Sequence, residues 1–185
     1  MKKLYQTFFE TMIGTEDNIE KFVKVGGAII IKEGKNREKL ALLVQRAADD
    51  HWPNAWEYPR GKCRKSENII KCIQREVKEE TGLDVEPHHL VDTFEYIADK
   101  GKRKSVCYNY LCKMKDENQK IKLSKEHQDY KWIMSVGEAE MLLYQDQKRI
   151  LIKVFNLDKQ IVNYPENNFS DDGNKIEEWL GSLWD

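Results

Sequence analysis

The chain has 185 residues, of which 40% are hydrophobic and 34% are charged, and its formal net charge is −1. This composition is typical of a soluble globular protein, and the length is sufficient for one domain with its own hydrophobic core. The near-zero charge excludes a global attraction to nucleic acids or membranes, so any basic patch must be local. The chain holds no apolar run of about eighteen residues, and we therefore expect no transmembrane helix.

The four cysteines, at positions 63, 72, 107 and 112, are widely spaced. No two of them form a close Cys-x-x-Cys pair, and no histidine follows them at the regular spacing of a zinc site. Reduced thiols are therefore favoured over a zinc site. The N-terminus lacks the apolar segment of a secretory signal, because Gln6, Thr7 and Glu10 interrupt it. These features together predict a cytoplasmic protein.

Residues 1–22 form a short amphipathic extension, which we expect to pack on the domain as a helix; binding of a partner is the alternative. We expect the first strand over residues 24–31 and a turn over 33–38. The next strand, over 40–46, is apolar enough to lie in the centre of a sheet. The Gly26-Gly27 pair predicts either a close approach of another segment to the first strand or a bulge.

An aromatic segment then leads into a helix. Trp56 and Tyr58 alternate along it and should share one face of a strand, where core packing is favoured over stacking on a nucleotide base. The following Arg60 and Lys62 are suited to pairing with phosphate oxygens, although solvated surface charges would explain them equally well.

The helix expected over residues 67–81 has two unlike faces. Ser66 is a natural N-cap, Glu67 should lie in the first turn, and Gly82 follows the last periodic residue. One face is an apolar stripe that must be buried, and it comprises Ile69, Ile70, Ile73 and Val77.

The other face of this helix carries Cys72 and three carboxylates, Glu76, Glu79 and Glu80, within about one turn. On an exposed helix such a run is only a solvated face. If the carboxylates are partly buried, two of them at ~4 Å repel each other by up to ~4 kcal/mol at an effective dielectric constant of ~20. That repulsion favours a hard cation with oxygen ligands, such as Mg²⁺.

This part of the chain resembles the Nudix box at every defined position. Gly61 is followed after five residues by Glu67 and after seven more by Arg75-Glu76; an apolar residue, Glu79-Glu80, Gly82 and Leu83 complete the pattern. The resemblance implies a Nudix hydrolase, an enzyme that cuts a nucleoside diphosphate linked to another moiety. It also implies an α/β/α sandwich with a mixed sheet, here with short N- and C-terminal extensions.

The resemblance further implies a cofactor and a set of site residues. We expect Mg²⁺ or Mn²⁺ on the carboxylates of Glu76, Glu79 and Glu80 and on the backbone carbonyl of Arg60, where it acidifies a water that attacks phosphorus in line. Arg75 should orient Glu76 or Glu67 by a charge-assisted hydrogen bond rather than touch the substrate. The expected catalytic residues are Arg75, Glu76, Glu80 and Glu126, and the expected substrate-binding residues are Arg46, Tyr58, Arg60 and Lys62.

After the box, a strand should begin at residues 83–85, and residues 90–97 and 105–112 should form a hairpin. The adjacent histidines at 88 and 89 are a poor chelate and are expected in a loop. The hairpin tip either holds a polyanion or is a solvated turn, which is favoured; its basic residues are Lys100, Lys102, Arg103 and Lys104.

In the rest of the chain we expect a flexible polar loop over 113–125, a strand over 126–133, and helices over 135–143 and 146–155. Residues 163–185 should form a polar tail with a short amphipathic end. The domain itself is expected to span residues 23–162. Glu126 precedes the strand, and the family resemblance makes it a candidate for a further carboxylate at the metal or at the attacking water. His127, Asp129 and Glu57 are its rivals.

Three functions remain open on the sequence. The protein is an enzyme that acts on a small compound such as a dinucleoside polyphosphate or a nucleotide sugar, an enzyme that removes the 5′ cap from RNA, or a regulator that binds RNA or nucleotides without turnover. The run from Tyr58 to Lys62 resembles the messenger-RNA decapping branch, whereas the chain lacks room for the regulatory domain of the best-known decapping enzymes. We favour the small nucleotide, and the complete box argues against loss of turnover.

Overall fold

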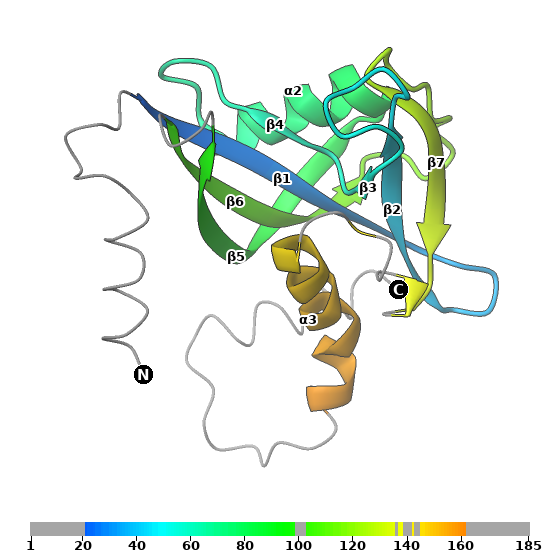
Figure 1. Ribbon diagram of the computed structural model, residues 1–185. Coiled ribbons are helices and arrows are strands. Elements are labelled where there is room, and N and C mark those ends of the chain that lie inside the picture. Colours follow the sequence, from blue (N-terminus) through cyan, green and yellow to red (C-terminus); the bar gives the residue numbers. More distant parts are fainter. Residues whose placement is uncertain (1–20, 99–102, 136, 139–141, 143–144, 162–185) are drawn as a thin grey trace.

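The computed structural model describes residues 21–98, 103–135, 137–138, 142 and 145–161 (Figure 1). The described elements are β1 (Lys21–Glu33), β2 (Lys39–Arg46), β3 (Trp56–Glu57), β4 (Arg60–Lys62), α2 (Ile69–Thr81), β5 (Val85–Ala98), β6 (Arg103–Met114), β7 (His127–Ile133) and α3 (Gln145–Ile161). The expected extension over 1–22 and tail over 163–185 lie almost wholly outside these residues, as does most of the helix predicted over 135–143. The domain boundaries at 23 and 162 therefore stay a prediction.

The strands form one mixed sheet in the order β3-β2-β1-β6-β5, with β4 paired to β1 and β7 paired to β2. β1 and β6 are parallel, from Lys21 opposite Arg103 to Ile31 opposite Lys113. The other strand pairs are antiparallel, including the predicted hairpin of β5 and β6. The mixed sheet expected from the family resemblance is thus confirmed.

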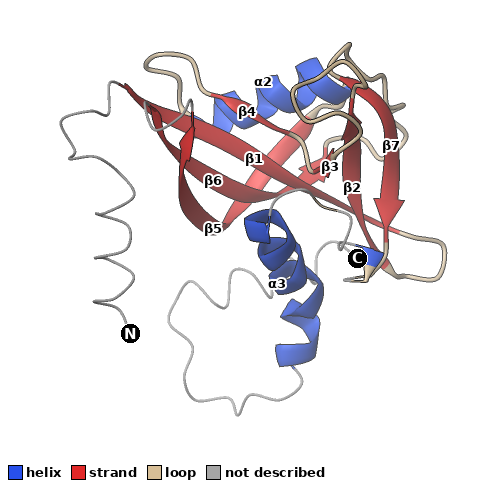
Figure 2. Ribbon diagram, viewed as in Figure 1, coloured by secondary structure: helices blue, strands red, loops and turns tan. Residues whose placement is uncertain are grey.

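The helices α2 and α3 cover opposite faces of this sheet (Figures 1 and 2). Successive residues of a strand point to opposite faces, and β1 therefore contributes to two cores. Ala28 and Ile30 pack in a buried cluster with residues of α2, whereas Ile29 and Ile31 pack in a second cluster with residues of α3. This arrangement confirms the predicted α/β/α sandwich.

The helix α2 begins later than the sequence predicted. Asn68, not Ser66, is its N-cap, because the Asn68 side chain accepts a hydrogen bond of 2.8 Å from the backbone amide of Ile70. Ser66 has a φ of 64° and belongs to the preceding turn, so Glu67 also lies before the helix and not in its first turn. Gly82 ends the helix as predicted, with a left-handed φ of 73°.

The apolar face of α2 packs closely on β1. Ile73 and Val77 are buried as predicted. Cys72, which the sequence places on the face of the carboxylates, is buried together with these two apolar residues. A β-carbon on Gly26 would lie 2.6 Å from Ile73 Cγ1, so a larger residue would push the helix off the strand. The glycine pair therefore marks a close approach, one of the two alternatives that the sequence left open.

Two segments after the helix differ from their predictions. His88 and His89 lie within β5, beside a bulge, and not in a loop, because β5 continues to pair with β6 along this stretch. The polar segment that follows β6 is fixed to the end of α2 by backbone hydrogen bonds from Lys122 to Thr81 at 2.8 Å and from Ser124 to Glu80 at 3.0 Å. Within the described ranges, neither helix is long and apolar enough to cross a membrane.

Candidate active site

The residues of the box meet where β4 faces α2. β4 pairs with β1, with Gly61 opposite Gly26, and this pairing holds the strand against the helix. A β-carbon on Gly61 would overlap the carboxyl group of Glu76, so only glycine lets that carboxyl approach the strand. The backbone amide of Arg60 donates a hydrogen bond to Glu80 Oε2 at 3.2 Å. The strand therefore brings the Arg60 backbone beside two of the three predicted metal-binding carboxylates.

The three carboxylates of α2 differ in burial. Glu80 is 6% exposed, Glu76 is half-buried, and the side chain of Glu79 is 52% exposed. Burial raises the pKa of Glu80 well above its usual range, and the charges of Glu57, Glu76 and Glu126 raise it further. Burial also raises the pKa of Glu76. Carboxyl groups crowded in this way fit a divalent cation with oxygen ligands, because the cation removes the cost of their charge.

Two further carboxylates face the same cluster from outside the helix. The charge of Glu126 raises the pKa of both Glu76 and Glu80, and the Ser124–Glu80 backbone bond holds its loop against α2. Glu126 therefore lies near enough for its charge to act on both carboxylates, and its role at the metal or the attacking water stays a prediction. Glu57 in β3 is only 2% exposed, and on the sequence it is only a rival of Glu126. The feature that could have identified Glu57 in the sequence is its charge, which stands alone between two aromatic residues.

Glu57 is neutralised by two arginines that were predicted to bind substrate. Arg46 Nη1 bonds Glu57 Oε1, and Arg60 Nε lies 3.1 Å from Glu57 Oε2. Arg46 also bonds Asp50 at 2.7 Å, and this bond is the main reason that the pKa of Asp50 falls to about 2. The two guanidinium groups are thus fixed in place beside the acidic cluster.

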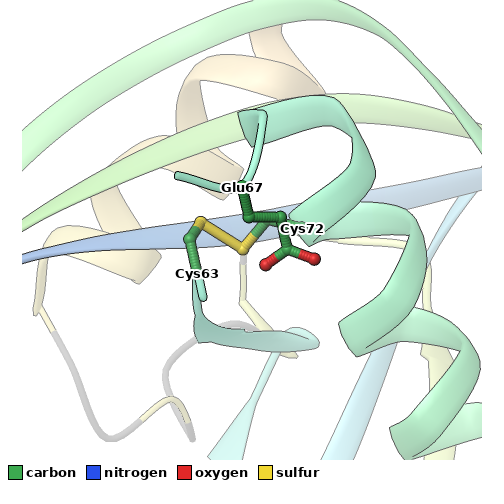
Figure 3. A group of neighbouring side chains, drawn as sticks. All are labelled: Cys63, Glu67 and Cys72. Atoms are coloured by element: carbon green, nitrogen blue, oxygen red, sulfur yellow. A yellow bond between two sulfur atoms is a disulfide. The ribbon is translucent and has the colours of Figure 1, made fainter. Parts of the chain in front are cut away.

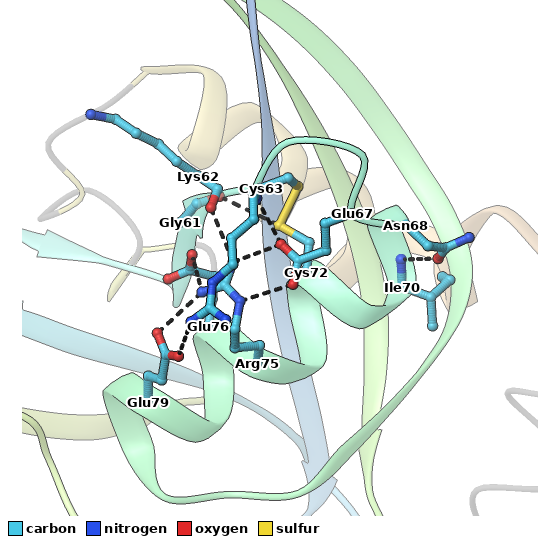
Figure 4. The surroundings of a disulfide bond; sticks show 11 residues. Gly61, Lys62, Cys63, Glu67, Asn68, Ile70, Cys72, Arg75, Glu76 and Glu79 are labelled. Atoms are coloured by element: carbon cyan, nitrogen blue, oxygen red, sulfur yellow. Dashed lines mark hydrogen bonds and ion pairs between the residues drawn. A yellow bond between two sulfur atoms is a disulfide. The ribbon is translucent and has the colours of Figure 1, made fainter.

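Arg75 connects the carboxylates of the box (Figure 4). It donates hydrogen bonds to Glu67 at 2.9 and 2.8 Å, to Glu76 at 2.7 Å and to Glu79 at 3.1 Å. A further bond of 3.1 Å joins Arg75 to the backbone carbonyl of Lys62, next to Gly61. The hydrogen bonds to Arg75 lower the pKa of Glu67 to about 2. These contacts are those of a residue that positions other side chains.

Tyr58 does not have the surface that a substrate-binding role requires. It is 0% exposed, it belongs to the core cluster under α3, and its hydroxyl donates a hydrogen bond of 2.6 Å to Asn109 Oδ1. The predicted substrate contact is therefore wrong, and the alternative of core packing holds. Trp56 packs against the same cluster, so the two aromatic residues share one face as expected.

The other two rivals of Glu126 have different surroundings. His127 is buried, its Nε2 lies 4.0 Å from Glu57 Oε1, and burial lowers the pKa of its imidazole. Its Nδ1 has no hydrogen-bond partner among the described residues. Asp129 is exposed on β7, where its carboxylate accepts a bond from the amide of Tyr130.

Cys63 and Cys72 form a disulfide between the loop after β4 and the first turns of α2 (Figure 3). The expectation of four reduced thiols is wrong for this pair, whereas Cys107 and Cys112 are free and buried. Glu67 lies within 4.8 Å of both sulfur atoms, but sulfurs joined in a disulfide are not thiolate ligands, and Glu67 is bonded to Arg75. This group is therefore a structural link and not a metal centre.

A cavity of about 410 Å³ opens beside Gly61. Cationic and aromatic side chains line it, among them Arg46, Arg60, Lys62, Arg103, Trp52 and Tyr96. Trp52 is 48% exposed, and no pattern in the sequence marks it as a site residue. Of the basic hairpin tip, Arg103 reaches this cavity and Lys104 pairs with Glu95 at 2.8 Å, whereas Lys100 and Lys102 lie outside the described residues.

Comparison with protein families and curated proteins gives concordant matches. The family model described as the NUDIX domain matches residues 23–154. The bis(5′-nucleosyl)-tetraphosphatase (asymmetrical) of Mus musculus is 32% identical over 114 residues, which cover 60% of this chain and 74% of that protein. The protein of the same name from Caenorhabditis elegans is 32% identical over 135 residues, covering 71% of this chain and 93% of that protein.

A relative with a different activity in its name has a similar sequence identity to this chain. The m7GpppN-mRNA hydrolase of Saccharomyces cerevisiae is 33% identical over 130 residues, which cover 70% of this chain but only 10% of that protein. Among solved structures, the binary complex of a C. elegans Ap4A hydrolase superposes with a TM-score of 0.62 at 24% identity, covering 77% of this chain and 99% of that one. This last similarity shows a common fold.

Proposed function

The chain belongs to the Nudix family of hydrolases, and we propose that it cuts a phosphoanhydride bond in a nucleoside diphosphate linked to a second moiety, with water as the nucleophile. The observation that carries the proposal is the Glu80 carboxyl group, which is 6% exposed and lies among the charges of Glu57, Glu76 and Glu126. Several carboxylates that converge on one buried point destabilise the protein unless a cation joins them. Their presence beside the box is explained by a metal-dependent reaction.

We propose Mg²⁺ or Mn²⁺ as the cofactor, held by Glu76, Glu80 and the carbonyl of Arg60, with Glu79 at the exposed edge of the site. When bound, the metal neutralises charge on phosphate oxygens and lowers the pKa of a water molecule. Arg75 keeps Glu76 and Glu79 in position through its hydrogen bonds of 2.7 and 3.1 Å. The exposed carboxylate of Glu126 is the proposed acceptor of the proton that the attacking water loses.

The cavity beside Gly61 is the proposed site for the nucleotide. Lys62 and Arg103 supply positive charge for phosphate oxygens, while Arg46 and Arg60 line the same cavity paired with Glu57. The exposed ring of Trp52 supplies a surface for a base. A dinucleoside polyphosphate is the substrate that we favour, because the curated tetraphosphatases match this chain over most of their own length.

Capped RNA is the second candidate. The run from Tyr58 to Lys62 resembles the decapping branch, and the m7GpppN-mRNA hydrolase of S. cerevisiae matches 70% of this chain. Arg103, which belongs to the basic hairpin, also lines the nucleotide cavity. These features give a longer polyanion a place beside the site.

The test is hydrolysis of a panel with and without Mg²⁺, with products identified by mass. The panel holds diadenosine tetraphosphate, a nucleotide sugar, an m7G-capped RNA and, as a control without an anhydride bond, adenosine monophosphate. We expect metal-dependent cleavage of one of the first three between two phosphorus atoms. Absence of turnover on all three at every metal concentration would contradict the proposal and favour a regulator that binds without catalysis.

A further inference from the structure

A second cavity, of about 590 Å³, shares Lys62 of β4 with the nucleotide cavity and has no role in the reaction proposed above. It is formed by the start of β1 and by the loop that leads from β4 to α2, which are joined by a bond of 2.9 Å from the Cys63 amide to the Lys24 carbonyl. Four cationic residues line it, namely Lys24, Lys62, Arg64 and Lys65. No aromatic side chain of the described chain lines it.

Of the four cations of this second cavity, Arg64 is compensated by an ion pair of 3.2 Å with Glu79. Lys24, Lys62 and Lys65 are exposed, and no described carboxylate forms an ion pair with any of the three. The single acid in the lining, Glu67, is held by Arg75 at 2.8 Å. Cations that lack acidic partners and aromatic neighbours suit phosphate groups and not bases.

The second cavity continues the first. Lys62 lines both, so the positively charged surface runs from the nucleotide cavity over β4 to the loop before α2. The Cys63–Cys72 disulfide fixes this loop to the helix (Figure 4). A ligand therefore meets cations whose backbone is already ordered, which reduces the entropic cost of binding.

We propose that the second cavity binds the phosphodiester backbone of a single-stranded RNA whose 5′ end lies in the nucleotide cavity. The proposal rests on the proposed function, because the nucleotide cavity must hold the end that is cut. A dinucleoside polyphosphate carries its few phosphates between two nucleosides, whereas an RNA chain presents a phosphate at each further nucleotide. The two cavities together thus support capped RNA, the second candidate, as a further substrate class in addition to the small nucleotide.

The test compares two variants with equal changes of charge. Lys24→Gln/Lys65→Gln changes two exposed residues that line the second cavity alone, and Lys115→Gln/Lys120→Gln changes two exposed lysines that line neither cavity. Binding of an m7G-capped RNA of 20 nucleotides and of a capped dinucleotide is measured from 50 to 200 mM salt in EDTA, so that no turnover occurs. Hydrolysis of a small dinucleotide with Mg²⁺ is measured in parallel.

The wild type and the control should bind the long RNA more tightly than the dinucleotide and with a steeper salt dependence. In the first variant the slope of log affinity against log salt should be flatter by about 1.4, which is ~0.7 for each of two phosphates. Between 50 and 200 mM salt, its loss of affinity should therefore be smaller than that of the wild type by a factor of ~7. Its hydrolysis of the small dinucleotide should stay unchanged. Equal salt dependence in the two variants, or a long RNA that binds no better than the dinucleotide, would overturn the proposal. Because binding is measured without turnover, failure of the enzymatic proposal would show separately, as RNA binding without hydrolysis of any substrate.

Discussion

The backbone amide of Arg60 donates a hydrogen bond of 3.2 Å to the buried carboxyl group of Glu80, and this bond joins β4 to the last turn of α2. It joins two of the groups proposed to hold the metal, the Arg60 backbone and the Glu80 carboxylate, which lie on elements whose positions are set by sheet pairing and helix packing. A site built on such rigid elements needs little rearrangement when a ligand binds.

Glu80→Gln should abolish turnover and also stabilise the metal-free protein. The folded-state pKa of Glu80 is raised, so its contribution to stability is full below its usual pKa and is lost as the pH rises through the raised value. The neutral amide of Gln avoids this loss at pH 7, and we expect a higher melting temperature in EDTA with hydrolysis reduced by at least ~10²-fold.

Glu79→Gln is the matched comparison on the same turn. Its carboxylate is 52% exposed and bonded to Arg64 and Arg75, so we expect a smaller loss of activity and no stabilisation. Melting curves in EDTA and initial rates at saturating Mg²⁺ distinguish the two variants. A Glu80→Gln protein that turns over at nearly the wild-type rate would show that the metal ligands are assigned wrongly.

Glu126→Gln should reduce kcat by ~10²–10⁴-fold, the usual effect of losing a general base. The charge of Glu126 reaches Glu76 and Glu80, whereas Asp129 lies exposed on β7, so Asp129→Asn serves as the control and should stay near the wild-type rate. The measurement is kcat over a range of pH. A loss of less than about threefold in Glu126→Gln would move the role to Glu57 or His127.

Glu67→Gln should destabilise the protein at neutral pH but not in acid. The hydrogen bonds to Arg75 lower the folded-state pKa of Glu67 from 4.5 to about 2, so this stability is present above pH 4.5 and is lost as the pH falls through about 2. We expect the free energy of unfolding to fall by ~1–3 kcal/mol at pH 7. Urea titrations from pH 7 to pH 2 should show the two proteins converging; a constant difference would contradict the assignment.

Reduction of the Cys63–Cys72 disulfide should lower the free energy of unfolding by ~2–3 kcal/mol, as expected for a short closed loop. Urea unfolding with and without dithiothreitol measures the difference. The Cys63→Ser protein is the control and should not respond to the reductant. Four reactive thiols in the untreated, denatured wild type would mean that the bond is absent.

Local periodicity explains why much of the fold was predictable. The i, i+4 recurrence of Ile69, Ile73 and Val77 identified the buried face of α2, and Gly82 marked its end because a left-handed residue is needed there. The start of the helix was misplaced because serine and asparagine cap helices almost equally well, and only the turn geometry chooses Asn68 over Ser66.

Burial and long-range pairing were the features that the sequence could not predict. Glu57 ends β3 and Tyr58 follows it directly, yet Tyr58 fills the core beneath α3 and Glu57 faces the acidic cluster. Cys63 and Cys72 meet only because the loop before α2 folds back on the helix. Such contacts depend on how elements pack, and spacing along the chain does not encode them.

The most direct measurement is hydrolysis of the substrate panel by wild-type and Glu80→Gln proteins in water labelled with heavy oxygen, first in EDTA and then across a Mg²⁺ titration. For the wild type we predict no turnover in EDTA, recovery as Mg²⁺ is added, and label in one phosphate of the product. Glu80→Gln should remain inactive at every Mg²⁺ concentration. Turnover that persists in EDTA, or that is equal in the two proteins, would contradict a metal-dependent reaction at this cluster of carboxylates.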